Sequence, residues 1–182
     1  QPLSVAGPVH AILDFASPAS PVDYLAHPLE TLRVGSVGVE NALRLAKEKG
    51  ARFLLSSTSE VYGMCAEPEF DEETSTLVLG PINKHRWIYS CSKQLMDRVI
   101  HAYGIKEHLR YTLFRPFNWI GPKLDNILEP KEGSSRVLTQ FIGNILRGQD
   151  IQLVDGGTQR RSFTYIDDGI DALMKIIENR EN

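Results

Sequence analysis

Three short apolar segments alternate with longer stretches of helical periodicity, and this alternation constrains the fold more than any other feature of the sequence. Residues 9–15, 52–56 and 111–115 have the length and composition of strands, and helices are predicted over residues 28–49 and 87–103. Gly50 and Gly104 are the expected helix ends, since glycine readily closes a helix. Strands that alternate with helices in this way form a parallel sheet with helices on both faces. The sequence therefore predicts an α/β protein with a doubly wound parallel sheet.

The rest of the chain continues the same pattern. Residues 63–86 are rich in acidic and turn-forming residues and are predicted to form a loop, and residues 116–122 are again turn-rich. Further helices are predicted over 137–146 and 167–178, with a strand over 151–154 between them. The 182 residues, 42% of them apolar, suffice for one domain with a sizeable core.

Polar residues follow each of the first three predicted strands. Ser17 comes after the first strand, Thr58 after the second, and Arg115 closes the third. Because crossovers between parallel strands are right-handed, the carboxyl ends of these strands are expected along one edge of the sheet. Ligands bind at that edge in open α/β sheets. The sequence thus predicts a site that these three positions share.

The residues nearest this predicted edge are of the types needed to polarise and deprotonate a sugar alcohol while an acceptor takes its hydride. Tyr89 and Lys93 are four residues apart, so they lie on one face of the predicted helix. Tyrosine has a pKa near 10, and a neighbouring ammonium helps it to act as a base at neutral pH. The Thr58 hydroxyl can polarise the same alcohol, and Glu60 adds a carboxylate. A Tyr-x-x-x-Lys pair occurs by chance in many helices, but the ordered motifs 57–63, 89–93 and 115–119 favour catalysis.

Structural alternatives exist for the same residues. Thr58 and Ser59 are also residue types that bond backbone groups at a strand end. Glu60 has an alternative as a solvated loop carboxylate, and Arg161 as a surface charge. Tyr89 and Lys93 have alternatives as a core-edge aromatic and a solvated helix lysine.

Composition and charge narrow the class of protein. The formal net charge of -3 does not favour binding to nucleic acid or to an anionic membrane. Cys65 and Cys91 do not form a disulfide framework, and the sequence shows no Cys/His spacing typical of a metal site. It also shows no signal peptide and no apolar run long enough to cross a bilayer. We therefore expect a cytoplasmic protein without a metal ion.

Longer motifs resemble the extended short-chain dehydrogenase/reductase family that acts on nucleotide sugars. The segment Ala16-Ser17-Pro18-Ala19-Ser20-Pro21, followed by Tyr24, is similar to UDP-glucuronate decarboxylases of the UDP-xylose synthase type. Residues 83–90 and 117–122 resemble instead the decarboxylase domain of the bifunctional polymyxin-resistance enzyme. Both relatives decarboxylate UDP-glucuronate, so the resemblance implies the same chemistry here.

The resemblance also implies roles for individual residues. It implies NAD as cofactor, a UDP-sugar as substrate, and a homodimer or higher homo-oligomer as the assembly. The implied catalytic residues are Thr58, Ser59, Glu60, Tyr89 and Lys93. The implied NAD contacts are Ala16, Ser17, Ser57, Tyr89, Lys93 and Pro116. The implied substrate contacts are Pro18, Tyr24, Asn118, Arg136 and Arg161. The resemblance also implies that the chain contains part of a small substrate-binding region.

The implied reaction begins with oxidation at the sugar C4 and continues with loss of carbon dioxide from the resulting 4-keto acid. The product stays open between UDP-xylose and the UDP-4-keto-pentose. A 4-epimerase or dehydratase of the same fold is the alternative, as is a non-catalytic remnant that serves as a binding module. Ser59 stands where 4,6-dehydratases carry an aspartate, and 4-epimerases usually lack a glutamate at the position of Glu60. Both comparisons favour decarboxylation.

The chain has no G-x-G-x-x-G phosphate loop of the kind that opens a Rossmann-type domain. By comparison with the family, it is expected to begin at the fourth strand and to stop before the C-terminal tail. Residues 1–182 are therefore interpreted as the central portion of a nucleotide-sugar epimerase/dehydratase-type domain. Whether this portion binds NAD without the loop is left open.

Overall fold

The computed structural model describes residues 2–128 and 136–179. The chain divides into two compact units. The first unit runs up to Pro116 and includes the chain from Ile177 onward, and the second comprises Phe117–Ile176. Each unit is described by itself.

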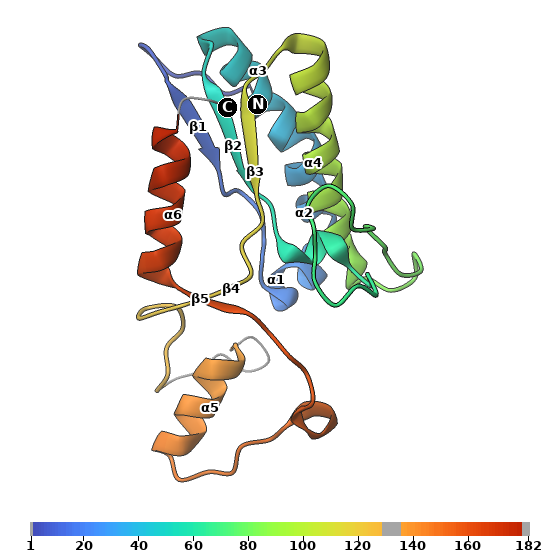
Figure 1. Cartoon of the computed structure of the whole chain (residues 1–182), viewed down its shortest axis with the longest axis vertical. Coiled ribbons are helices and arrows are strands. Elements are labelled where there is room, and N and C mark those ends of the chain that lie inside the picture. Colours follow the sequence, from blue (N-terminus) through green and yellow to red (C-terminus); the bar gives the residue numbers. More distant parts are fainter. Residues whose placement is uncertain (1, 129–135, 180–182) are drawn as a thin grey trace. The chain divides into compact units, whose positions relative to one another are not determined.

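The first unit contains a parallel sheet of three strands. These are β1 (Ala11–Asp14), β2 (Arg52–Ser56) and β3 (Tyr111–Phe114), in the spatial order β1-β2-β3 (Figure 1). β1 and β2 pair along their whole length, from Ala11 opposite Arg52 to Asp14 opposite Leu55. β2 then pairs with β3, with Phe53 opposite Tyr111. The predicted α/β class and the parallel pairing of the strands are confirmed.

Two helices, α3 (Val39–Lys49) and α4 (Trp87–Glu107), pack on one face of this sheet. Two shorter helices, α1 (Pro21–Ala26) and α2 (Pro28–Arg33), and a 3-10 turn, η2 (Ser59–Tyr62), pack against α4. Figure 1 shows α3 and α4 on the same side of β2 and β3. Burial of apolar side chains between these elements drives their packing. The buried core consists of Val39, Ala42, Leu43, Ala46, Phe53, Leu55, Met96 and Ile100.

The predicted helix over 28–49 is divided by a wide π-helical turn, η1 (Val34–Gly38). The turn brings Gly35 against α4, where a Cβ on Gly35 would lie only 1.9 Å from the Ser92 hydroxyl. Helical periodicity predicted the extent of this segment but not the extra residue in its middle turn, because π-turns depend on tertiary packing.

The helix predicted over 87–103 continues past Gly104 and ends at Glu107. A Cβ on Gly104 would lie 2.3 Å from the ring of Tyr111, so this glycine allows α4 to approach β3 and does not end the helix. His108 ends it instead, in the left-handed conformation with φ 54°. The expectation that Gly104 closes the helix is therefore wrong.

The second unit contains β4 (Asn118–Ile120), α5 (Val137–Leu146), a 3-10 turn η3 (Val154–Gly157), β5 (Phe163–Tyr165) and most of α6 (Ile166–Glu178). β4 and β5 pair in parallel, with Asn118 opposite Phe163. β4 lies within the segment predicted as turn-rich, and neither three-residue strand was expected. Residues 151–154 do not form the predicted strand. Leu153 and Val154 are largely exposed there, and the segment has no partner strand among the described residues.

No helix in residues 2–128 or 136–179 combines the length and the apolarity that crossing a lipid bilayer requires.

Candidate active site at the carboxyl edge of the parallel sheet

The carboxyl ends of the three parallel strands form one edge of the first unit, as predicted. Beyond the strands, backbone hydrogen bonds continue between the segments after β2 and β3. The Ser57 amide donates to the Phe114 carbonyl (2.9 Å), and the Ser59 amide donates to the Pro116 carbonyl (3.3 Å). These bonds hold Ser57 and Thr58 at the sheet edge, where both side chains are buried.

Tyr89 lies in the first turns of α4, and its side chain is buried. Burial raises the pKa of Tyr89 to about 12, because the phenolate loses hydration, while a hydrogen bond with the Thr58 hydroxyl acts in the opposite direction. Thr58 Oγ1 also accepts the Glu60 amide (3.2 Å) and so caps η2. The Thr58 side chain can therefore bond a backbone amide and still lie beside Tyr89, so its structural and catalytic interpretations do not exclude each other.

Lys93 follows Tyr89 by one helical turn, as the spacing predicted. Its ammonium donates to the Ser56 carbonyl at the end of β2 (2.8 Å). Burial lowers the pKa of Lys93, and the carboxylates of Asp14 and Asp97 oppose this effect. The lysine is thus a buried cation at the strand end and not the solvated helix lysine of the structural alternative.

Glu60 lies at the start of η2 and contacts two side chains that the sequence did not single out. Its Oε2 accepts Arg86 Nη1 (3.2 Å) and Ser90 Oγ (3.3 Å). The sequence could have indicated both residues by their position, since Arg86 precedes Tyr89 by about one helical turn and Ser90 follows Tyr89 directly. The alternative of a fully solvated Glu60 does not describe this geometry.

Tyr24, predicted to contact substrate, lies beside Tyr89. The two rings are stacked, with centroids 5.3 Å apart and planes 8° from parallel. Burial raises the pKa of Tyr24, the Glu60 carboxylate raises it further, and a hydrogen bond with Arg86 lowers it. Tyr24, Glu60, Arg86 and Tyr89 therefore form one contiguous cluster.

A buried ion pair between Arg115 and Asp97 lies next to this edge. Arg115 donates to Asp97 (3.2 Å) and to the Tyr62 hydroxyl (3.0 Å). Burial raises the pKa of Asp97, and the Ser57 hydroxyl and the Arg115 guanidinium oppose this effect. Arg115, which the sequence placed at the strand end, thus ties β3 to α4.

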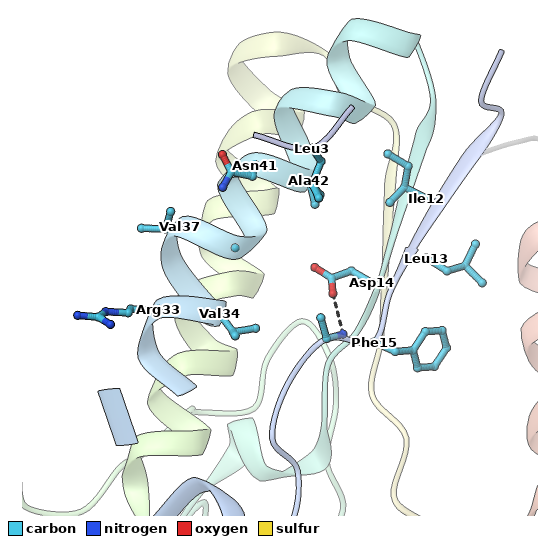
Figure 2. A pocket seen from close by; sticks show the side chains of 12 residues that line it. Leu3, Ile12, Leu13, Asp14, Phe15, Arg33, Val34, Val37, Asn41 and Ala42 are labelled. Carbon is cyan, nitrogen blue, oxygen red and sulfur yellow. Dashed lines mark hydrogen bonds between the residues drawn. The ribbon is translucent and has the colours of Figure 1, made fainter. Parts of the chain in front are cut away.

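The segment after β1 adjoins a pocket of about 820 Å³ between β1 and the helices η1 and α3. Figure 2 shows Asp14 directed toward the helix that carries Asn41 and Ala42, with Leu13 and Phe15 on the other side of the strand. Ala16 lines this pocket, and its amide donates to Asp14 (2.9 Å).

Ser17 offers a test of whether this region fits a ligand. Its Oγ is buried and has no hydrogen-bond partner among the described residues. Buried polar atoms are normally paired, so such an atom fits a site that a polar ligand completes. Ala16 and Ser17 therefore fit contacts to the expected dinucleotide. Pro18 follows them and is half-buried.

In the second unit, Asn118 and Arg136 line a pocket of about 460 Å³. Arg136 Nη1 pairs with Asp125 (3.1 Å), and the Asn118 amide donates to the Ser162 carbonyl (2.9 Å). Arg161 is exposed, donates to the Arg160 carbonyl (2.7 Å) and is not part of this lining. The structure thus brings together two of the three predicted substrate contacts in this unit.

Within the parts of the chain that the structure describes, no three His, Cys, Asp or Glu residues are grouped as metal ligands.

The parallel sheet, the polar carboxyl edge and the helix with Tyr89 and Lys93 define a Rossmann-like α/β protein. Residues 4–182 match the model of the NAD dependent epimerase/dehydratase family, and the chain belongs to that family. The prediction of an extended short-chain dehydrogenase/reductase is confirmed at this level.

Solved structures share the fold. The PbgP3 protein from Burkholderia pseudomallei is 58% identical, with a TM-score of 0.80 over 93% of this chain and 51% of that chain. The UDP-N-acetylglucosamine 4-epimerase from Methanobrevibacter ruminantium, in complex with UDP-N-acetylmuramic acid, is 22% identical (TM-score 0.80, 95% of this chain, 53% of that chain). The dTDP-glucose 4,6-dehydratase from Bacillus anthracis, in complex with NAD, is also 22% identical (TM-score 0.73, 94% and 48%). The chain spans about half the length of these structures.

Proposed function

We propose that this chain is the central portion of an NAD-dependent enzyme that decarboxylates UDP-glucuronate through a 4-keto intermediate. The observation that carries the proposal is the cluster at the sheet edge, in which the Glu60 carboxylate adjoins the stacked rings of Tyr24 and Tyr89. The cluster combines a tyrosine base, a threonine hydroxyl and a carboxylate. The 58% identity to the PbgP3 protein and the family membership are compatible with it.

In the proposed first step, Tyr89 removes the proton of the sugar 4-hydroxyl. Thr58 bonds the same hydroxyl and orients it, and the buried Lys93 ammonium, one helical turn after Tyr89, favours the phenolate. NAD, when bound, supplies the acceptor for the C4 hydride. The chain's proposed cofactor contacts are Ala16, Ser17, Ser57, Tyr89, Lys93 and Pro116.

In the proposed second step, the C4 ketone makes the C5 carboxylate a β-keto acid. The C5–carboxylate bond breaks, carbon dioxide leaves, and the electron pair of that bond moves into the ketone as an enolate. Glu60, with Ser59 beside it, then relays a proton to C5 of the enolate, which gives the 4-keto pentose. The other proposed substrate contacts are Pro18, Tyr24, Asn118, Arg136 and Arg161. A homo-oligomeric assembly stays a prediction.

Two substitutions test the proposal, and both are made in the full-length protein that the complete reading frame encodes. Tyr89→Phe removes the base and keeps the ring, so turnover of UDP-glucuronate should fall by about a hundred- to ten-thousand-fold. Glu60→Gln keeps the shape and removes the charge, so carbon dioxide release should fall while affinity for the UDP-sugar changes little. Both quantities are measured for each variant. Tyr103→Phe, a half-buried ring beside the core, and Glu40→Gln, an exposed carboxylate paired with Arg44, are the matched controls.

Retained activity in Tyr89→Phe would remove the dehydrogenase mechanism, and normal turnover in Glu60→Gln would return Glu60 to a structural role. If the wild type converts UDP-glucuronate without releasing carbon dioxide, an epimerase or dehydratase replaces the decarboxylase. Binding of UDP and NAD without turnover would indicate a binding module.

A further inference from the structure

Asp97 continues the face of α4 that carries Tyr89 and Lys93. The three residues follow one another at intervals of four, so their side chains lie along one face of the helix. All three are buried, and Asp97 is only 5% exposed. Because a carboxylate is almost never buried without partners, the surroundings of Asp97 show what this carboxylate does.

The first partner of Asp97 is Arg115, which follows β3. Arg115 Nη2 donates to Asp97 Oδ2 (3.2 Å). The same guanidinium donates to the Tyr62 hydroxyl (3.0 Å) and lies over the Tyr62 ring, 5.1 Å from the centroid. These contacts fix the carboxylate beside the end of the strand, and they engage one of its two oxygens.

The second oxygen of Asp97 is not engaged by this ion pair. Asp97 Oδ1 is buried and makes no hydrogen bond of good geometry within the described part of the chain. Burial raises the pKa of Asp97, whereas the adjacent Ser57 hydroxyl and the charges of Arg115 and Lys93 favour the ionised form. A buried oxygen is normally bonded, so a structural ion pair alone does not account for Asp97.

Lys93 is the cation that the charge of Asp97 reaches. Burial lowers the pKa of Lys93, and the carboxylates of Asp14 and Asp97 oppose this effect. The Lys93 ammonium donates to the Ser56 carbonyl (2.8 Å), which holds the group in place but carries no net charge. Asp14 already accepts the Ala16 amide (2.9 Å). The charge that keeps Lys93 protonated therefore comes from two carboxylates, and one of them lies on α4 itself.

The elements around this face of α4 contribute few other ionisable groups. These are Tyr24 of α1, Glu60 and Tyr62 of η2, Asp14 of β1 and Arg115 after β3. The charged side chains of α2 and α3 are exposed or half-buried. Glu60 pairs with Arg86, and its charge acts on Tyr89.

We propose that Asp97 is a positioning residue that holds Lys93 as an ammonium ion beside Tyr89, through the carboxylate oxygen that the ion pair with Arg115 leaves unbonded. The proposal rests on the proposed function, since the charged lysine favours the Tyr89 phenolate in its first step. Asp97 touches neither sugar nor dinucleotide in this role and acts only through Lys93.

The test follows the protonation of Lys93 itself. Nuclear magnetic resonance of the full-length protein with ¹³C-labelled lysines gives the midpoint of the titration, and the Lys93 signal is assigned by its loss in Lys93→Arg. Asp97→Asn keeps the shape and removes the charge, so the midpoint should move to lower pH by about one pH unit. Glu107→Gln is the matched control, since Glu107 is an exposed carboxylate on the same helix that pairs with Lys47, and it should leave the midpoint unchanged.

A double variant keeps the test decisive if Asp97→Asn does not fold. The single substitution leaves the buried Arg115 without its counter-ion, which is strongly destabilising. Asp97→Asn with Arg115→Gln removes both charges and should still move the midpoint to lower pH, because Asp97 is the member of the pair whose charge acts on Lys93. An unchanged midpoint in the folded variant would overturn the proposal.

The pH dependence of turnover supplies the functional readout. In Asp97→Asn, or in the double variant, Lys93 loses its charge at lower pH, so the alkaline fall of kcat should also begin at lower pH. An equal loss of kcat at every pH would indicate a structural role and overturn the proposal. The proposed function is judged separately, because a wild type that releases no carbon dioxide contradicts decarboxylation, whereas the Lys93 midpoint is measured without turnover.

Discussion

At the scale of single residues, the burial of Tyr89 opposes the ionisation that a catalytic base needs. The side chain is 7% exposed, stacked on Tyr24 and close to the Glu60 carboxylate, and each of these surroundings disfavours a phenolate. The phenol of this chain therefore stays neutral near pH 7. For Tyr89 to act as a base, additional positive charge must come close to it in the loaded site, and Lys93 lies one helical turn away on the same face of α4.

This environment predicts an alkaline titration that can be measured directly. In the protein without cofactor, Tyr89 should ionise at a pKa of about 12, above the ordinary value of 10.0. Because the folded pKa is raised, the neutral phenol stabilises the fold fully below pH 10. That contribution, at most roughly 3 kcal/mol, is lost as the pH rises toward 12. Ultraviolet titration of the wild type and of Tyr89→Phe isolates this step, and urea unfolding at several pH values follows the stability. Ionisation of Tyr89 near pH 10 would contradict the prediction.

The sequence predicted the positions along the chain better than the contacts between them. Tyr89 and Lys93 were predictable because helical spacing alone places them on one face, and Thr58 because it follows an apolar strand. Arg86 and Ser90 were missed because helical position places them beside Tyr89 but does not show that Glu60 of η2 packs against them. Arg161 was assigned by resemblance, and the structure leaves its side chain exposed and outside the lining of the pocket of Asn118 and Arg136.

At the scale of elements, the long buried segments were predictable and the short ones were not. β2 and α5 have the predicted bounds, since each carries a clear apolar pattern of the right length. β4 and β5 have three residues each, which is too few for a periodic pattern to be recognised. Their backbone pairing with each other defines them as strands. Residues 151–154 have the composition of a strand but no strand partner among the described residues, so composition alone gave the wrong element.

The π-turn η1 has no room for one additional methyl group at Gly35. A Cβ at Gly35 would lie 1.9 Å from Ser92 Oγ, whereas a Cβ at Gly38 would find its nearest neighbour at 3.6 Å. Gly35→Ala should therefore destabilise the fold by about 1–3 kcal/mol through overpacking. Gly38→Ala, the matched control, should be neutral or stabilise by roughly 0.5–1 kcal/mol through helix propensity. Urea unfolding measures both.

Ser92→Ala tests the stated cause of the Gly35 effect. It removes the hydroxyl that the new methyl group would meet, so the double variant should regain part of the lost stability relative to Gly35→Ala alone. Strictly additive losses would show that the clash with Ser92 is not the cause.

At the scale of the whole molecule, the sheet of the first unit ends in an apolar edge. β1 has β2 on one side, and no other strand in the described residues pairs with its outer edge. Leu13 and Phe15, on or just after β1, are 38% and 49% exposed, and the adjoining pocket is lined mostly by apolar side chains. An unpaired, apolar edge strand is a template for association with another chain.

We therefore expect the 182-residue chain to associate in solution, or to be poorly soluble, through the edge of β1. Leu13→Lys places a charge on that edge strand, and charged residues there oppose strand pairing, so association should weaken. Leu29→Lys is the matched control, because Leu29 is 62% exposed but lies on α2 and not on a strand. Sedimentation velocity over a range of concentrations measures the association of each protein. A monodisperse wild-type monomer, or an equal effect of Leu29→Lys, would show that the edge of β1 does not drive assembly.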